Sequence, residues 1–222
     1  MNLQKPRKTI QLPRLPKNLS STLAADELIQ DEGEYSQLRL TNQNWAAQTT
    51  EHLSFKSSWF KQVNLEQTRF LAPKLLDLRL ENCDLANAAW EKALLQRVEI
   101  LGCRMTGFKA IEAHFQDVLF RDCIGALAQF RFATFKSVQF ERCNFANADF
   151  QGANLAGVRF VKCDLSNAEM SHTTLTSTDF RSSKIEGLKV GVRELPGAIM
   201  DHFQAAYVAS RLGIVIKAED ED

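Results

Sequence analysis

The residues of this chain with the widest range of possible chemistry are its five cysteines, at positions 83, 103, 123, 143 and 163. Thiols can form disulfides, bind metals or act as nucleophiles. An odd number of cysteines does not suit a disulfide framework. Their regular spacing of 20 residues would stack them in one column, and parallel thiols in a column lack the convergent geometry of a tetrahedral metal site. We therefore interpret the cysteines as core filler and predict no metal site and no cofactor.

The four histidines, His52, His114, His172 and His202, are dispersed along the sequence. No nucleophile accompanies them at a fixed spacing. The chain also lacks a glycine-rich phosphate loop and a cluster with metal-ligand spacing. The sequence thus predicts no catalytic residues, and we expect that the protein is not an enzyme.

The charge of the chain is balanced, with 27 basic and 27 acidic residues and a formal net charge of zero. This balance provides no overall attraction to nucleic acid or to an anionic membrane. No apolar run approaches the ~20 residues needed to span a bilayer, and the first residues lack the apolar core of a signal peptide. We expect a cytoplasmic protein that binds neither nucleic acid nor membrane directly.

The cysteine spacing is part of a longer pattern with a period of five. Every fifth residue from Tyr35 to Met200 is large and apolar, except Thr50, Ala110 and Gly125. A helix repeats near 3.6 residues and a strand near 2, so this period must come from a coil. A second register of slimmer residues, which includes all five cysteines, lies two positions earlier. Residues two apart in an extended segment point to the same side, so both registers face inward.

Columns of like residues at a spacing of twenty indicate four sides per coil, because twenty is four fives. The cysteines form one column, and four valines, at positions 98, 118, 138 and 158, form another. The pattern predicts about eight coils which, at ~4.8 Å each, give a rod of roughly 40 Å. Gly125 is an exception: no large neighbour replaces it, and Ile124 and Leu127 lie at outward positions. We expect a local distortion there.

The tract from Cys143 to Leu155, CNFANADFQGANL, resembles the A-(D/N)-L-x-x signature of the pentapeptide repeat family. Members of this family fold as right-handed quadrilateral β-helices, so the resemblance implies an all-β solenoid of this kind. We divide the chain into three parts. Residues 1–34 are a basic flexible tail and an N-terminal cap, 35–195 are the β-helix, and 196–222 are a helix, a short β segment and an acidic tail. The basic tail is either a solubilising terminus or an arm for acidic partners.

The C-terminal part predicts a short helix that caps the last coil. Asp201 and Gln204 have the spacing of a capping box, and Gly213 is a typical residue just beyond a helix end. The apolar face of this helix is predicted to consist of Phe203, Tyr207, Val208 and Leu212. Residues Ile214 to Ile216 are predicted to form a β-like segment after it.

The same region closely resembles the ending of the bacterial quinolone-resistance pentapeptide proteins, in which this element joins two rods end to end. The residues that carry the resemblance are Gly197, Asp201, Gln204-Ala205 and Leu212-Gly213-Ile214. The resemblance implies a homodimer built on residues about 190–216, with the apolar helix residues, Ile214 and Ile216 at the interface.

The outward positions are where a binding function is expected on such a rod. By phase, Ile111 and Phe132 share a corner on adjacent coils and form a candidate partner patch. We interpret the protein as a non-enzymatic interaction scaffold that binds a macromolecular partner through its outer faces. The C-terminal resemblance implies an alternative, a DNA-mimicking protein that binds DNA gyrase or another topoisomerase and protects against quinolones. A structural protein without a fixed partner is a third interpretation.

Overall fold

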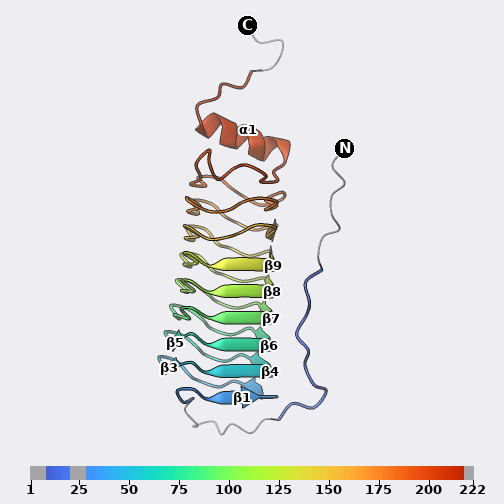
Figure 1. The fold of residues 1–222 in the computed structure, drawn as a ribbon, viewed down its shortest axis with the longest axis vertical. Coiled ribbons are helices and arrows are strands. Elements are labelled where there is room, and N and C mark those ends of the chain that lie inside the picture. The colour runs from blue at the N-terminus through green and yellow to red at the C-terminus, as the bar shows by residue number, and fades with distance from the viewer. Residues whose placement is uncertain (1–8, 21–28, 218–222) are drawn as a thin grey trace.

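The computed structural model describes residues 9–20 and 29–217 and shows a rod of stacked coils (Figure 1). Each coil contacts the next through parallel pairs of residues 20 positions apart, such as Phe55 with Leu75. One sheet has the strand order β1-β4-β6-β7-β8-β9-β10, with β2 also paired to β4, and a second sheet pairs β3 with β5. The elements are β1 (Glu34–Ser36), β2 (Arg39–Thr41), β3 (Thr49–Glu51), β4 (Ser54–Lys61), β5 (Arg69–Leu71), β6 (Lys74–Glu81), β7 (Leu94–Leu101), β8 (His114–Arg121), β9 (Thr134–Glu141), β10 (Arg159–Val161) and α1 (His202–Arg211).

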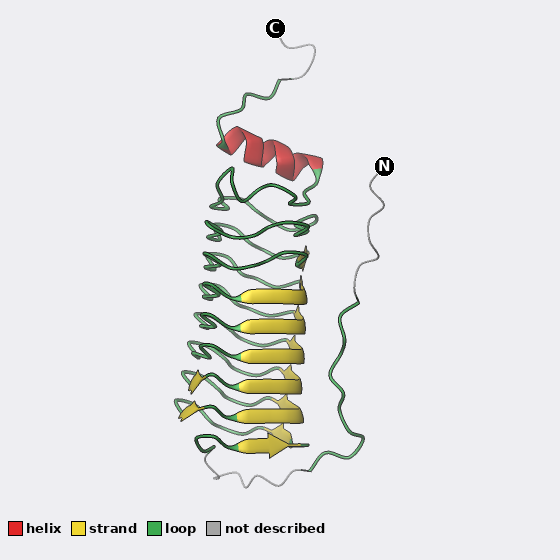
Figure 2. Ribbon diagram, in the orientation of Figure 1, coloured by secondary structure: helices red, strands yellow, loops and turns green. Residues whose placement is uncertain are grey.

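The predicted fold class, an all-β solenoid with a short C-terminal helix, is confirmed. Regular strands occupy about six turns rather than the eight coils predicted. Beyond β10 the same 20-residue step continues as isolated parallel bridges, the last of which joins Asp179 to Ile199. These coils are therefore drawn as loops in Figure 2 although they continue the stack.

Left-handed backbone geometry recurs at every fifth residue and turns the corners. Asn82 and Asn87 have φ of 52° and 54°, and each lies two positions after a large inward residue. Asn and Asp just before such an inward residue fix the turn with their side chains. The Asn144 Oδ1 accepts a hydrogen bond from the Ala146 N–H at 3.0 Å, and the Asp149 Oδ1 accepts one from Gln151 at 2.9 Å. This side-chain turn gives the physical reason for Asn and Asp in the repeat.

The two inward registers form one core that runs the length of the rod. Phenylalanine rings stack coil on coil: the centroids of Phe120 and Phe140 lie 4.6 Å apart, those of Phe140 and Phe160 5.0 Å, and those of Phe160 and Phe180 5.5 Å. All five cysteines are free and buried in this core. Their packing follows the filler interpretation.

The distortion predicted at Gly125 is absent. The Gly125 N–H donates to the Asn144 carbonyl at 2.7 Å, and the Ile124–Asn144 bridge is intact. A Cβ on Gly125 would lie 2.2 Å from Cε1 of Phe145, so the ring from the next coil fills the space that a side chain would occupy. Ile124 and Leu127 stay outward and are 55% and 57% exposed. The prediction failed because the compensating residue is 20 positions away in the sequence.

The N-terminal strap, which we define as residues 9–19, lies against the rod rather than forming a flexible tail (Figure 1). The Arg14 N–H donates to Asp77 at 3.0 Å, and the Gln11 N–H donates to Asp117 at 3.4 Å. Pro13 keeps the strap extended because its ring fixes φ and disfavours a helical residue before it. Sequence reasoning missed this contact because its acceptors lie 63 and 106 positions away.

Three predicted segments fall outside the described residues. Residues 1–8 hold most of the basic charge of the predicted tail, residues 21–28 most of the predicted N-terminal cap, and residues 218–222 the acidic tail. Ile29, which was predicted to face inward from that cap, is buried in the core at 5% exposure.

Candidate functional site

Apart from the buried column of cysteines, chemically reactive side chains do not gather at one place in the described part of the chain. Within residues 9–20 and 29–217, no group of three or more His, Cys, Asp or Glu side chains could hold a metal ion. A hydrogen bond with Cys143 and burial raise the pKa of the Cys123 thiol, which favours its neutral form. No helix of the described residues is long and apolar enough to cross a bilayer.

The outward charges of adjacent coils neutralise one another. Lys61 pairs with Glu81 at 3.3 Å and Arg121 with Glu141 at 2.9 Å, each across one 20-residue step. The hydrogen bond and the charge of Arg142 lower the pKa of Asp122. Such pairs contribute little stability each, roughly 0–1 kcal/mol, when exposed. Their main consequence is that these columns present no continuous charge of one sign.

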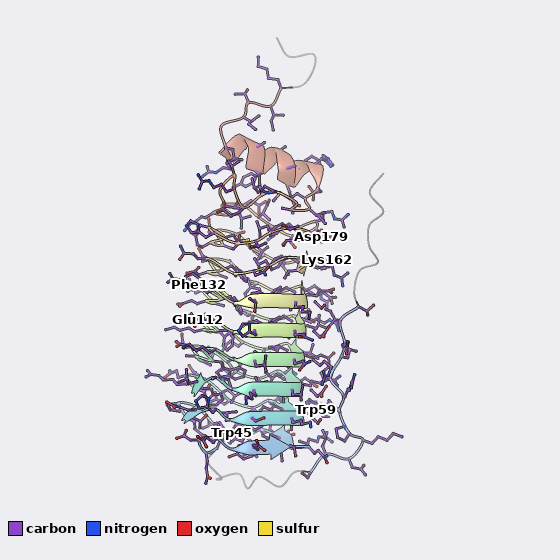
Figure 3. The ribbon with its side chains drawn as sticks, viewed as in Figure 1. Trp45, Trp59, Glu112, Phe132, Lys162 and Asp179 are labelled. Atoms are coloured by element: carbon purple, nitrogen blue, oxygen red, sulfur yellow. The ribbon has the colours of Figure 1, made fainter. Side chains whose placement is uncertain are left out.

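The predicted patch of Ile111 and Phe132 is partly accessible. Phe132 is 55% exposed and projects from the edge of the rod one coil above Glu112 (Figure 3), whereas Ile111 is half-buried. The Phe132 ring lies over Gly152 of the next coil. A Cβ added to Gly152 would lie 2.5 Å from Cδ1 of this ring.

Three exposed large apolar side chains lie on a single coil. Ile124, Leu127 and Phe132 are all more than half exposed, and we call these three residues the apolar coil patch. Sequence reasoning singled out each of them but did not group them. The available signal was three large residues at outward phases within nine positions.

The helix α1 covers the last coil with a polar and an apolar anchor. Asp201 and Gln204 form the predicted capping box, and Gln204 Nε2 also donates to the Phe180 and Ser183 carbonyls at 2.8 and 2.7 Å. Val208 is 8% exposed. The Tyr207 hydroxyl accepts a hydrogen bond from the Gly187 N–H at 2.6 Å. These contacts satisfy polar groups at the open end of the solenoid.

The other two residues assigned to this apolar face, Phe203 and Leu212, are exposed. Phe203 is 75% exposed and Leu212 40%. Gln204 and Val208 define the inward line of the helix and, at about 100° per residue, Phe203 and Leu212 fall on its two flanks. The β segment predicted for Ile214 to Ile216 is wrong for the described residues: these three pair with no strand there and are 57%, 80% and 56% exposed.

Comparisons with known proteins identify the repeat. The family model of the pentapeptide repeat region matches residues 74–143 and 133–192, which together span more than half of the 222 residues. No curated protein sequence matches the chain.

Solved structures of repeat proteins also resemble the chain. QnrB1, a plasmid-mediated fluoroquinolone resistance protein, is 19% identical over 82% of this chain and 100% of its own, with a TM-score of 0.36. HetL from the cyanobacterium Nostoc sp. strain PCC 7120, a protein involved in heterocyst differentiation regulation, is 16% identical over 77% and 90%, with a TM-score of 0.37. Rfr23 from the cyanobacterium Cyanothece 51142 is 12% identical over 77% and 89%, with a TM-score of 0.25.

Proposed function

Because the chain belongs to the pentapeptide repeat family, we propose that it is a non-enzymatic scaffold that binds a protein partner through an outer face of its β-solenoid. A solenoid offers a long, rigid surface because each coil is fixed to its neighbours. The parallel pairing of each coil with the next, such as that from β6 to β9, supports this rigidity.

The apolar coil patch is the observation that carries this proposal. Ile124, Leu127 and Phe132 are 55%, 57% and 55% exposed on one coil, while the charges around the rod are largely paired. Several large apolar side chains left exposed on one coil mark a candidate interaction site. The backbone of this coil is held on both sides, so a partner would meet a preorganised surface.

The test is capture of partners with an I124N/L127N/F132N variant beside the wild type. Asn already occupies the positions equivalent to 124 and 127 on the next coil, Asn144 and Asn147, and Asn tolerates the left-handed φ of 58° at position 132, so the fold should be retained. A variant with L71N and L94N, two exposed leucines elsewhere, is the matched control. A protein that binds the wild type and the control but not the patch variant supports the proposal. Equal recovery on all three would place the binding face elsewhere.

We also propose that the protein forms a homodimer through its C-terminal end. Support comes from the exposed apolar residues there, Phe203, Leu212 and Ile214 to Ile216, which no described residue covers. An F203S/I214S/I216S variant leaves Gln204 and Val208, the anchors of α1, unchanged. Light scattering should then give a dimer for the wild type and a monomer for the variant. A dimer in both samples would reject this interface.

The alternative, a DNA-mimicking protein that binds gyrase, receives little support from the surface charges. Imitation of a phosphate backbone requires sustained negative potential. Here acidic residues of adjacent coils are neutralised, as in the Arg79–Glu99 and Arg142–Asp122 pairs at 2.6 and 2.7 Å. A supercoiling assay with gyrase, with and without a fluoroquinolone, tests it directly. Inhibition or protection without DNA binding would make gyrase the partner; no effect at micromolar protein would favour the general scaffold.

A further inference from the structure

One corner of the rod carries charged residues on three successive coils beneath the strap. Asp77, Arg97 and Asp117 lie on β6, β7 and β8, 20 positions apart, and each has a left-handed φ between 52° and 55°. We call these three residues the corner track. The carboxylates of the track hold the strap by the backbone of the strap: the Arg14 N–H donates to Asp77 and the Gln11 N–H donates to Asp117.

The spacing of the corner track matches that of any extended peptide. Two coils rise ~9.6 Å, and three extended residues, from Arg14 to Gln11, span about 10 Å. Backbone N–H groups therefore meet carboxylates two coils apart, whatever the side chains are. The strands β6, β7 and β8 pair with one another on both sides of the track residues, so the strap is not needed to align the track.

The charge of the corner track favours a basic occupant. Asp77 and Asp117 are only 4% and 7% exposed. Arg97 forms a bidentate pair with Asp77 at 2.6 and 2.7 Å, which leaves the charge of Asp117 in excess within the track. Burial of an incompletely compensated carboxylate is costly. The strap brings one basic residue to the track, Arg14, whose charge helps to lower the pKa of Asp77.

The strap itself is held by few strong anchors. Leu12 is 55% exposed. The five most covered residues of the strap are all only half-buried: Ile10, Pro13, Leu15, Pro16 and Leu19. Such a segment, with few buried apolar contacts, belongs to the part of a structure that opens most easily. A competing segment could therefore replace it.

We propose that the corner track is a docking site for an extended basic segment of a partner protein, with the strap bound there as an intramolecular competitor. This inference rests on the scaffold role proposed above, to which it adds one face and one partner chemistry. The interaction would follow the general mode in which an extended peptide is held chiefly through its main chain.

The experiment measures fluorescence anisotropy of a labelled peptide with the sequence of residues 9–19, added to the full-length protein. A Q11P/R14P variant of the full chain lacks both N–H donors of the strap. Because the tethered strap competes at an effective concentration of about millimolar, we expect the variant to bind the peptide about tenfold more tightly than the wild type, or better. No binding to the variant would overturn the proposal.

Two controls decide whether the corner track is the site. In the Q11P/R14P background, D117S should weaken binding about tenfold, because a charge-assisted hydrogen bond is lost; Ser137 occupies the same corner on the next coil. D122S removes the same charge from an exposed pair outside the track and should change nothing. Equal losses from D117S and D122S, or equal binding of a peptide with Glu in place of Arg14 and Lys17, would reject the proposal. Failure of the corner-track proposal would not reject the scaffold role, because the I124N/L127N/F132N variant tests the apolar coil patch separately.

Discussion

The packing of Gly125 against Phe145 predicts a strong coupling between two residues 20 positions apart. In Gly125→Ala, the new Cβ would lie 2.2 Å from Cε1 and 2.7 Å from Cδ1 of the Phe145 ring. That ring is fully buried between Phe130 and Phe140, at centroid distances of 5.7 and 5.1 Å, so it has little room to move. Overpacking of this kind costs about 1–3 kcal/mol. Loss of glycine flexibility in the unfolded chain offsets about 0.4–1 kcal/mol of it.

The partner substitution removes the obstacle. Phe145→Ala should cost about 3–5 kcal/mol through lost packing and a cavity. In that background the Cβ introduced by G125A points into the vacated space, so G125A should be neutral or stabilising by about 0.4–1 kcal/mol. The two substitutions should therefore be coupled by about 1–3 kcal/mol, as neighbours in contact are.

The wild type, the two single variants and the double variant form a double-mutant cycle. Urea unfolding followed by far-ultraviolet circular dichroism measures the free energy of unfolding of all four proteins, and an unchanged m value is required for the comparison. Gly157→Ala is the control: its φ of 76° strains an alanine, but nothing lies within 4 Å of the new Cβ. It should be destabilising by about 1 kcal/mol and uncoupled from F145A. Additive effects of G125A and F145A would refute the claim that the ring occupies this space.

Three further outcomes are expected. Leu127 has a φ of 62°, so L127N should keep or raise the free energy of unfolding, by up to about 1 kcal/mol, because Asn tolerates this conformation; a lower urea midpoint would contradict this. Burial raises the pKa of Asp77, but its hydrogen bond and charge pairing with Arg97 outweigh this and hold the pKa below its ordinary value. The resulting stabilisation is present above the unfolded pKa of ~3.9 and is lost as the pH falls through the lower folded value. Thermal melts of D77N should therefore depend less on pH in the acid range than those of the wild type, and equal slopes would argue against the pair. C123S should shift stability by less than about 1 kcal/mol, because Ser183 in the same column already donates to the Phe160 carbonyl at 3.0 Å; a large loss in the same urea assay would show that the thiol has a further role.

The extent to which the candidate surfaces could be predicted differs between residues. Phe132 is outward by phase and is exposed, because it lies at a left-handed corner of the coil, outside the two inward registers. Phe203 was assigned to the buried face of α1 but is exposed, because Gln204 rather than an apolar residue fixes the orientation of the helix by bonding the last coil. The strap on Asp77 could not be foreseen, since no periodicity connects Arg14 with it.

The sequence by itself determined the four-sided solenoid. A period of five with two inward registers admits one backbone path, and Asn or Asp at the turns fixes each corner locally. The tertiary structure alone decided which outward residues stay accessible and how gaps in the repeat are filled. Phe145 fills the space at Gly125, and the strap covers Asp117, through contacts between residues that are distant in sequence. Periodicity records which way a side chain points, whereas close packing and charge compensation depend on what lies opposite it.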